Sequence, residues 1–266
     1  MSKISNLFQS GKIKSAFIPY FTLGDPNYDS SIQFGKTILD KGADILELGI
    51  PFSDPVADGP VIQRAVTRSL KNGFSFSELF RVTKEIHRHK PEVPLVYLTY
   101  FNPIYHCGIR AFLNSAKESG IVGLVIPDLP FDTKESEELF AELKKRDMDL
   151  VHLVTPASTK KRIQALSKTS SGFIYYVTSF GVTGERRELS VDLKEKIQSL
   201  RNLLKLPICA GFGISTPDQA SEISQYADGV IIGSAVQRVI EENGSNQDLA
   251  VQKLGDYISS IRNVMK

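Results

Sequence analysis

The chain has 266 residues, of which 41% are hydrophobic and 23% charged, and its 32 basic and 30 acidic residues give a formal net charge of +2. These values are ordinary for a globular protein and exclude a disordered, collagen-like or coiled-coil chain. The sequence has no basic run and no basic-aromatic array, so neither nucleic acid nor a membrane surface is expected as a partner.

Cysteine usage and the amino terminus bear on the cellular compartment. Cys107 and Cys209 are the only cysteines, and neither has a spacing typical of a zinc site, so we expect no metal and no disulfide framework. Residues 1–14 lack a long apolar segment of the secretory type. We therefore expect a cytoplasmic protein.

In chain order, a short helix is expected at residues 3–11, followed by eight short apolar runs that alternate with charged, amphipathic stretches. The runs, which we interpret as strands, cover residues 15–21, 44–50, 94–100, 121–126, 149–154, 172–177, 206–211 and 227–233. Their apolar character is nearly continuous, as in parallel strands buried on both faces.

Three of the intervening stretches carry helix-start signals. Ser75 with Glu78, and Asp132 with Glu135, have the spacing of a capping box. Thr216 followed by Pro217 is typical of an N-cap and a first helical residue.

Eight strand-helix units in one chain favour a closed (β/α)8 barrel, the TIM barrel, over an open doubly wound sheet. No proline-rich linker divides the chain, so we predict a single domain over residues 1–266. Residues 51–73 are longer than one connection needs, and they predict an extended loop after the second strand. Long loops at this end of a barrel strand usually build the active site.

Glu47 is a carboxylate within an apolar strand. Strand alternation directs Leu46 and Leu48 toward the helices and Glu47 into the barrel. Burial there should raise the pKa of the carboxyl group, which suits a general acid or base. The alternative is a structural glutamate with a buried partner, but the predicted strand cores hold no lysine or arginine.

The loop after this strand contains Asp54 and Asp58 among prolines and a glycine. Asp58 lies eleven residues after Glu47 on the same connection, so the two carboxylates could face one ligand from different sides. The alternative is ordinary turn chemistry, because aspartate before proline or glycine is common in turns.

Glycine-rich turns follow the last two strands, at Gly211 to Gly213 and at Gly233 with Ser234. Barrels often bind phosphate at these two loops, where backbone N–H groups and a helix N-terminus meet the anion. After the sixth strand, residues 178–188 contain glycines and charges that predict a mobile lid. In that lid Thr183 could reach a carboxylate and Gly184 could add an N–H group to the phosphate site.

Taken together, these segments resemble the tryptophan synthase alpha-subunit family over nearly the whole chain. The segments that carry the resemblance are residues 21–26, 46–60 (LELGIPFSDPVADGP), 181–184, 211–215 and 233–234. The second of them is highly specific by itself. The resemblance implies a barrel that cleaves indole-3-glycerol phosphate to indole and glyceraldehyde 3-phosphate, with no metal or cofactor in this chain. It also implies a pyridoxal-phosphate beta subunit as the partner, in an α2β2 complex.

On the matching positions, the resemblance implies that Glu47 is the acid/base and that Asp58 binds the indole N–H, with Tyr175 supporting Glu47 and Thr183 covering the site. Other matching positions fall into three groups: a phosphate site of Gly184, Gly211, Gly213, Gly233 and Ser234; an indole pocket of Tyr20, Leu98 and Phe212; and a partner contact of Asp54, Asp128 and Pro130. Two positions depart from the pattern, because Tyr20 replaces the phenylalanine of many relatives and Ser179 replaces an arginine of some.

Other functions fit parts of the pattern. One is another phosphate-binding barrel, such as an epimerase or a ring-forming indole-glycerol-phosphate synthase, although the synthase should need a lysine inside the barrel. A different class is a non-catalytic barrel that binds a phosphorylated ligand and regulates a partner. Glu47 and Asp58 argue against that class.

Overall fold

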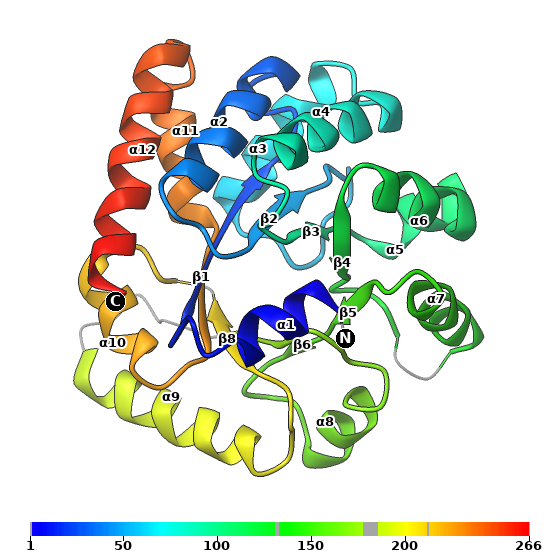
Figure 1. Cartoon of the computed structure of the whole chain (residues 1–266), viewed down its shortest axis with the longest axis vertical. Coiled ribbons are helices and arrows are strands. Elements are labelled where there is room, and N and C mark those ends of the chain that lie inside the picture. The colour runs from blue at the N-terminus through cyan, green and yellow to red at the C-terminus, as the bar shows by residue number, and fades with distance from the viewer. Residues whose placement is uncertain (1, 131–132, 178–185, 212, 266) are drawn as a thin grey trace.

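Parallel strands form a nearly closed barrel that helices surround in the computed structural model of the chain (Figure 1). The structure describes residues 2–130, 133–177, 186–211 and 213–265, with the backbone alone at residues 186–192. The strands are β1 (Ala16–Thr22), β2 (Leu46–Gly49), β3 (Leu95–Leu98), β4 (Ile121–Val125), β5 (Asp149–Val151), β6 (Leu153–Val154), β7 (Ile174–Val177), β8 (Ile208–Gly211) and β9 (Gly229–Ile232). Each strand falls in one of the predicted apolar runs, except that β1 extends one residue beyond its run, to Thr22.

The fifth predicted strand is divided at His152 into β5 and β6. β5 pairs with β4, as Leu124 with Leu150, whereas β6 pairs with β7, as Leu153 with Tyr175. The order within the sheet is β5-β4-β3-β2-β1-β9-β8-β7-β6, so its two ends are adjacent parts of one segment. The described strands therefore form the predicted eight-unit TIM barrel, with one strand that changes its partner midway.

The helices that alternate with the strands are α1 (Lys3–Gln9), α2 (Tyr28–Asp40), α3 (Pro60–Lys71), α4 (Phe76–His89), α5 (Phe101–Cys107), α6 (Ile109–Glu118), α7 (Lys134–Lys144), α8 (Lys160–Leu166), α9 (Arg186–Arg201), α10 (Pro217–Ser224), α11 (Ser234–Asn243) and α12 (Gln247–Val264). The predicted N-terminal helix is α1. Its Ile4 is fully buried in the cluster inside the barrel, and the Phe8 ring meets the Phe173 ring with centroids 6.2 Å apart. α1 therefore closes the amino-terminal end of the barrel.

Helix starts agree with the sequence at two of three places. Ser75 caps α4, and Thr216 caps α10 with Pro217 as its first residue. The prediction for α7 was wrong, because the capping pair is Thr133 with Ser136. The Thr133 hydroxyl is placed to accept from the N–H group of Ser136, so the helix begins one residue later than predicted.

Side chains alternate along β2 as predicted. Leu46 and Leu48 are fully buried in the outer core between strands and helices. Ile45 points the other way and belongs to the cluster inside the barrel, so Glu47 also points inward. Residues 50–59 then form the extended loop, and α3 follows it as an additional helix before α4. This arrangement brings Glu47 and the loop to the carboxyl-terminal end of the barrel.

Candidate active site

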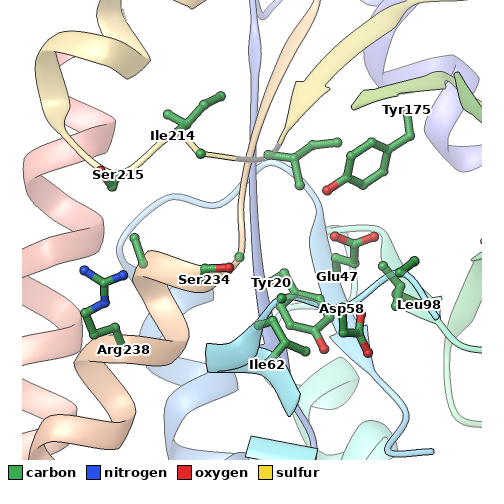
Figure 2. A pocket seen from close by; sticks show the side chains of 16 residues that line it. Tyr20, Glu47, Asp58, Ile62, Leu98, Tyr175, Ile214, Ser215, Ser234 and Arg238 are labelled. Atoms are coloured by element: carbon green, nitrogen blue, oxygen red, sulfur yellow. The ribbon is translucent and has the colours of Figure 1, made fainter. Parts of the chain in front are cut away.

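A pocket opens at the carboxyl ends of the strands and encloses about 790 Å³, its mouth included. Residues on β1, β2 and β7 line it, as do residues of the loop after β2 and of the turns after β8 and β9. Figure 2 shows that acidic and aromatic side chains gather on one side of this pocket. Ser215, Ser234 and Arg238 lie on the other side. The pocket is therefore divided into two chemically different ends.

Glu47 lies deep at the acidic end and is only 1% exposed. Neither of its carboxyl oxygens has a hydrogen-bond partner among the described residues. Burial, and secondarily the nearby charge of Asp58, raises the pKa of Glu47 to about 8. The side chain therefore carries a proton at neutral pH and can donate it to a bound molecule.

Asp58 reaches the same end of the pocket from the loop, and Figure 2 shows its side chain on the same side of the pocket as Glu47. Burial raises the pKa of Asp58, and a hydrogen bond with the Tyr100 hydroxyl opposes that rise. The same hydroxyl accepts the N–H group of Ala57 at 3.0 Å, which fixes the loop. Because a donated hydrogen bond favours the charged form, Asp58 is better suited than Glu47 to remain a carboxylate.

Tyr100 was missed by the sequence analysis. It follows β3, the neighbour of β2, so its side chain leaves the barrel at the edge where the loop of Asp58 begins. A polar aromatic residue at the last position of a predicted strand, residues 94–100, was the only signal in the sequence. It could have been read only together with the order of the strands.

Tyr175 on β7 completes the acidic end, and burial, followed by the charge of Glu47, raises the pKa of its hydroxyl. Its ring packs over Gly211, where a Cβ atom would lie 2.7 Å from the ring. Gly211 does not line the pocket. Gly211, which was predicted for the phosphate site, thus lies against Tyr175 at the end of β8, two residues before Gly213.

Tyr20 and Leu98 both line the pocket, as the indole-pocket prediction requires. The Tyr20 hydroxyl is 3.1 Å from the Thr22 hydroxyl, within hydrogen-bond distance. It also lies over Gly49, where a Cβ atom would be 2.1 Å from the hydroxyl oxygen. The added hydroxyl of Tyr20 is thus positioned by Thr22 of the same strand, and it fits because Gly49 on β2 has no side chain.

Gly213, Gly233 and Ser234 lie together at the second end of the pocket. Gly213 has a φ of +78°, a conformation that favours glycine, and Gly233 precedes the first residue of α11. The free N–H groups and the dipole at the start of this helix attract an anion. Thr183, Gly184 and Phe212, which were also predicted for the site, lie outside the described residues.

Arg238 lines the same end and was missed by the sequence analysis. It follows Ser234 by four residues, about one helical turn, so both side chains lie on one face of α11. Figure 2 shows its guanidinium group on the side of the pocket where Ser234 and Ser215 lie. The sequence signal was available but required counting a turn beyond the glycine-rich segment.

The predicted partner-contact residues lie on segments that follow the carboxyl ends of β2 and β4. Asp54 is on the loop after β2, and Asp128 and Pro130 follow β4. The Asp128 carboxylate accepts the N–H group of Phe101 at 2.9 Å, which ties this segment to α5. Val56, on the loop of Asp54, is 78% exposed.

Two further properties of the described residues bear on function. They contain no group of three or more histidine, cysteine or acidic side chains placed to hold a metal ion. Within the same residues, no helix combines the length and the apolar character needed to cross a bilayer.

Comparison with known proteins gives consistent matches over the full length of the chain. The family model described as tryptophan synthase alpha chain matches residues 8–266. The tryptophan synthase alpha chain of Leptospira biflexa serovar Patoc is 78% identical over 262 residues, covering 98% of each protein.

Solved structures agree. The alpha subunit of tryptophan synthase from Legionella pneumophila strain Paris superposes with a TM-score of 0.91 at 31% identity, covering 100% of this chain and 98% of that one. A chain in the aminoacrylate-bound tryptophan synthase of M. tuberculosis has a TM-score of 0.87 at 28% identity, with 100% of both chains covered.

Proposed function

The chain belongs to the tryptophan synthase alpha chain family, and on this premise we propose how its pocket carries out the family's reaction. That reaction is a carbon-carbon lyase step of tryptophan biosynthesis, in which indole-3-glycerol phosphate is cleaved to indole and glyceraldehyde 3-phosphate. The observation that carries the proposal is Glu47, buried in a pocket that Asp58 also lines, with Gly213, and Gly233 at the start of α11, across the same pocket; burial raises the pKa of Glu47 to about 8.

Glu47 is the proposed acid and base. It gives its proton to C3 of the indole ring, which makes the ring a leaving group. The resulting carboxylate takes the proton from the hydroxyl group on the adjacent glycerol carbon. That carbon becomes the aldehyde as its bond to C3 breaks, and the bonding electron pair returns to the ring. The pKa of Glu47, about 8, suits a group that must both hold and release a proton near neutral pH.

Asp58 is proposed to accept the indole N–H and to stabilise the positive charge that develops on the ring nitrogen. The hydrogen bond of Tyr100 supports this role, because it favours the charged form of Asp58. Two carboxyl groups in one pocket then have different protonation states, as an acid and an electrostatic stabiliser require. Tyr175, buried beside Glu47, is proposed to support that residue.

The phosphate group is proposed to bind at Gly213, Gly233 and Ser234, at the start of α11. Binding of this remote end would hold the reacting carbon near Glu47 and convert binding energy into orientation. Tyr20 and Leu98 are proposed to contact the indole ring. On the resemblance alone, Thr183 is proposed to cover the site, Gly184 to add to the phosphate site, and Phe212 to complete the indole pocket.

The chain acts with a tryptophan synthase beta chain as its partner. We propose that Asp54, Asp128 and Pro130 contribute to the contact, in an α2β2 complex. Val56 lies on the loop of Asp54 and Tyr105 lies on α5. Their apolar side chains are 78% and 63% exposed, which supports a docking surface that includes these two segments.

We also propose that pyridoxal phosphate belongs to the beta chain and that this chain needs no cofactor, since protonation at C3 requires only acid and base groups. A cytoplasmic location is proposed from the two cysteines, both free thiols. A single domain is proposed because one sheet takes strands from residue 16 to residue 232.

Indole release from indole-3-glycerol phosphate by the purified chain tests the proposed function, with and without a beta chain. We expect slow release by the chain alone and faster release with the partner. Asp58→Asn should lower kcat/KM by about 100-fold, because the developing charge loses its stabilising carboxylate. Asp256→Asn, on an exposed position of α12, is the matched control and should retain wild-type kinetics. Binding of substrate with no indole release, even with the partner, would favour a non-catalytic barrel.

Arg238 should strengthen phosphate binding without taking part in the chemistry. The side chain is exposed, so we expect Arg238→Gln to raise KM by only about three- to fivefold, with kcat unchanged. Arg238→Lys should keep most of the affinity. Steady-state kinetics at low and high salt provide the measurement, and the effect should shrink as salt is added. Lys253→Gln on exposed α12 is the control, and an equal KM change in that variant would contradict the assignment.

A further inference from the structure

A partly buried polar network joins three elements of the barrel. We call it the clamp and define it as Asp25, which follows β1, Arg68 on α3, and Gln237 and Glu241 on α11. Arg68 donates to both carboxyl oxygens of Asp25, with distances of 2.7 and 2.8 Å. Its remaining terminal nitrogen donates to Glu241 at 2.6 Å. One guanidinium group thus connects the end of β1 with α11.

Gln237 closes the network from the side of α11. Its amide nitrogen donates to Asp25 at 2.5 Å, and its amide oxygen accepts the N–H group of Thr22 on β1 at 2.9 Å. Gln237 and Thr22 are fully buried, and Asp25 is 1% exposed. Buried charges and amides are costly when a partner is lost, so this geometry tolerates little displacement.

The clamp connects two helices, and the amino terminus of each lies next to one end of the pocket. α3 begins at Pro60, two residues after Asp58, and it contributes Arg68. α11 begins at Ser234, beside the anion site, and it contributes Gln237 and Glu241. The two helices also pack against each other. A shift between them would change the distance from Asp58 to the anion site.

We propose that Asp25, Arg68, Gln237 and Glu241 are positioning residues that fix the separation between the acidic end and the anion end of the pocket. The inference rests on the proposed function, because it requires one substrate that spans both ends. A ligand that occupies both ends gains affinity only if the ends stay at the matching distance. The affinity of a ligand that occupies only one end does not depend on that distance.

The test compares three probes by calorimetry: indole, glycerol 3-phosphate, and a non-cleavable indole-3-alkyl phosphate that spans the pocket. Arg68→Lys keeps the positive charge but cannot form the two-pronged contact with Asp25. We expect it to weaken binding of the spanning ligand by about tenfold and to change either fragment by less than about twofold. kcat/KM should fall at least as much as the affinity for the spanning ligand.

Arg64→Gln is the matched control. Arg64 also pairs with Glu241, at 2.7 Å, but its side chain is 54% exposed and it does not reach Asp25. All three affinities should therefore stay at wild-type values. If Arg68→Lys does not fold, the same comparison is made with Glu241→Gln. A loss of about threefold on the spanning ligand is expected, because glutamine removes the charge that pairs with Arg68 but leaves the contact of Arg68 with Asp25 in place.

Equal weakening of all three probes in a folded variant would overturn the inference, because it would indicate general loosening of the pocket. Unchanged binding of the spanning ligand would overturn it as well. Failure of the proposed function is distinguishable, since it would be observed in the wild type. There the spanning ligand would bind no better than the fragments, and both proposals would fall together.

Discussion

Replacing Glu47 with glutamine should almost abolish indole release, with kcat lower by about 10³- to 10⁴-fold, the upper range for loss of a general acid and base. Glutamine has nearly the same shape but no transferable proton, so C3 of the indole ring can no longer be protonated by this side chain. Binding of glycerol 3-phosphate should be retained, because the anion end lies across the pocket. Indole release and calorimetric titration measure the two properties separately.

Glu118→Gln, on an exposed position of α6, is the matched control for this substitution and should behave as the wild type. A Glu47→Gln variant that keeps more than about a tenth of the wild-type kcat would contradict the assigned role, because a general acid contributes more than that. Loss of both activity and ligand binding would instead indicate a damaged pocket, which makes the titration an essential part of the experiment.

The same substitution should give the protein a free energy of unfolding that exceeds the wild-type value by more and more as the pH rises. The pKa of Glu47 is about 8 in the folded chain, against an ordinary value of 4.5. The native state therefore binds this proton more tightly than the unfolded state does. The stability that this proton contributes is fully present below pH 4.5 and is lost as the pH rises toward 8. At pH 7 the loss amounts to about 3 kcal/mol, and glutamine, which does not titrate, avoids it.

Denaturant unfolding of both proteins between pH 5.5 and 8 is the measurement. The advantage of Glu47→Gln in free energy of unfolding should grow by about 3 kcal/mol across this range. The growth with pH matters more than the offset at one pH, because the offset also contains the cost of burying an amide. A difference that stays constant with pH would show that the buried carboxyl has an ordinary pKa in the folded chain.

These two results would have a common origin. Burial, and secondarily the charge of Asp58, destabilises the charged form of Glu47 and so raises its pKa, and neither of its oxygens has a hydrogen-bond partner among the described residues to oppose the effect. A hydrogen bond from a lysine or arginine would stabilise the barrel but would keep the carboxyl group ionised. A site that needs a protonated carboxyl group is therefore expected to reduce stability, as functional sites often do.

The sequence by itself determined the fold class and the direction of Glu47. Strand runs and amphipathic stretches are local patterns. Successive side chains of any strand face opposite sides, so Glu47 must point away from the side that Leu46 and Leu48 face. The glycines after the last two strands likewise indicated an anion site without any knowledge of distances. The specific segment at residues 46–60 identified the family.

Only the tertiary structure decided which distant residues meet. Tyr100 reaches Asp58 because β3 lies beside β2, and β5 gives way to β6 at His152 because the barrel must close. Gly211 proves to lie under Tyr175 because β8 is the neighbour of β7.

The clamp joins residues 25 and 237, which are 212 positions apart. No periodic pattern links such positions, because each contact depends on the order and register of strands, and these are fixed only when the whole sheet has formed.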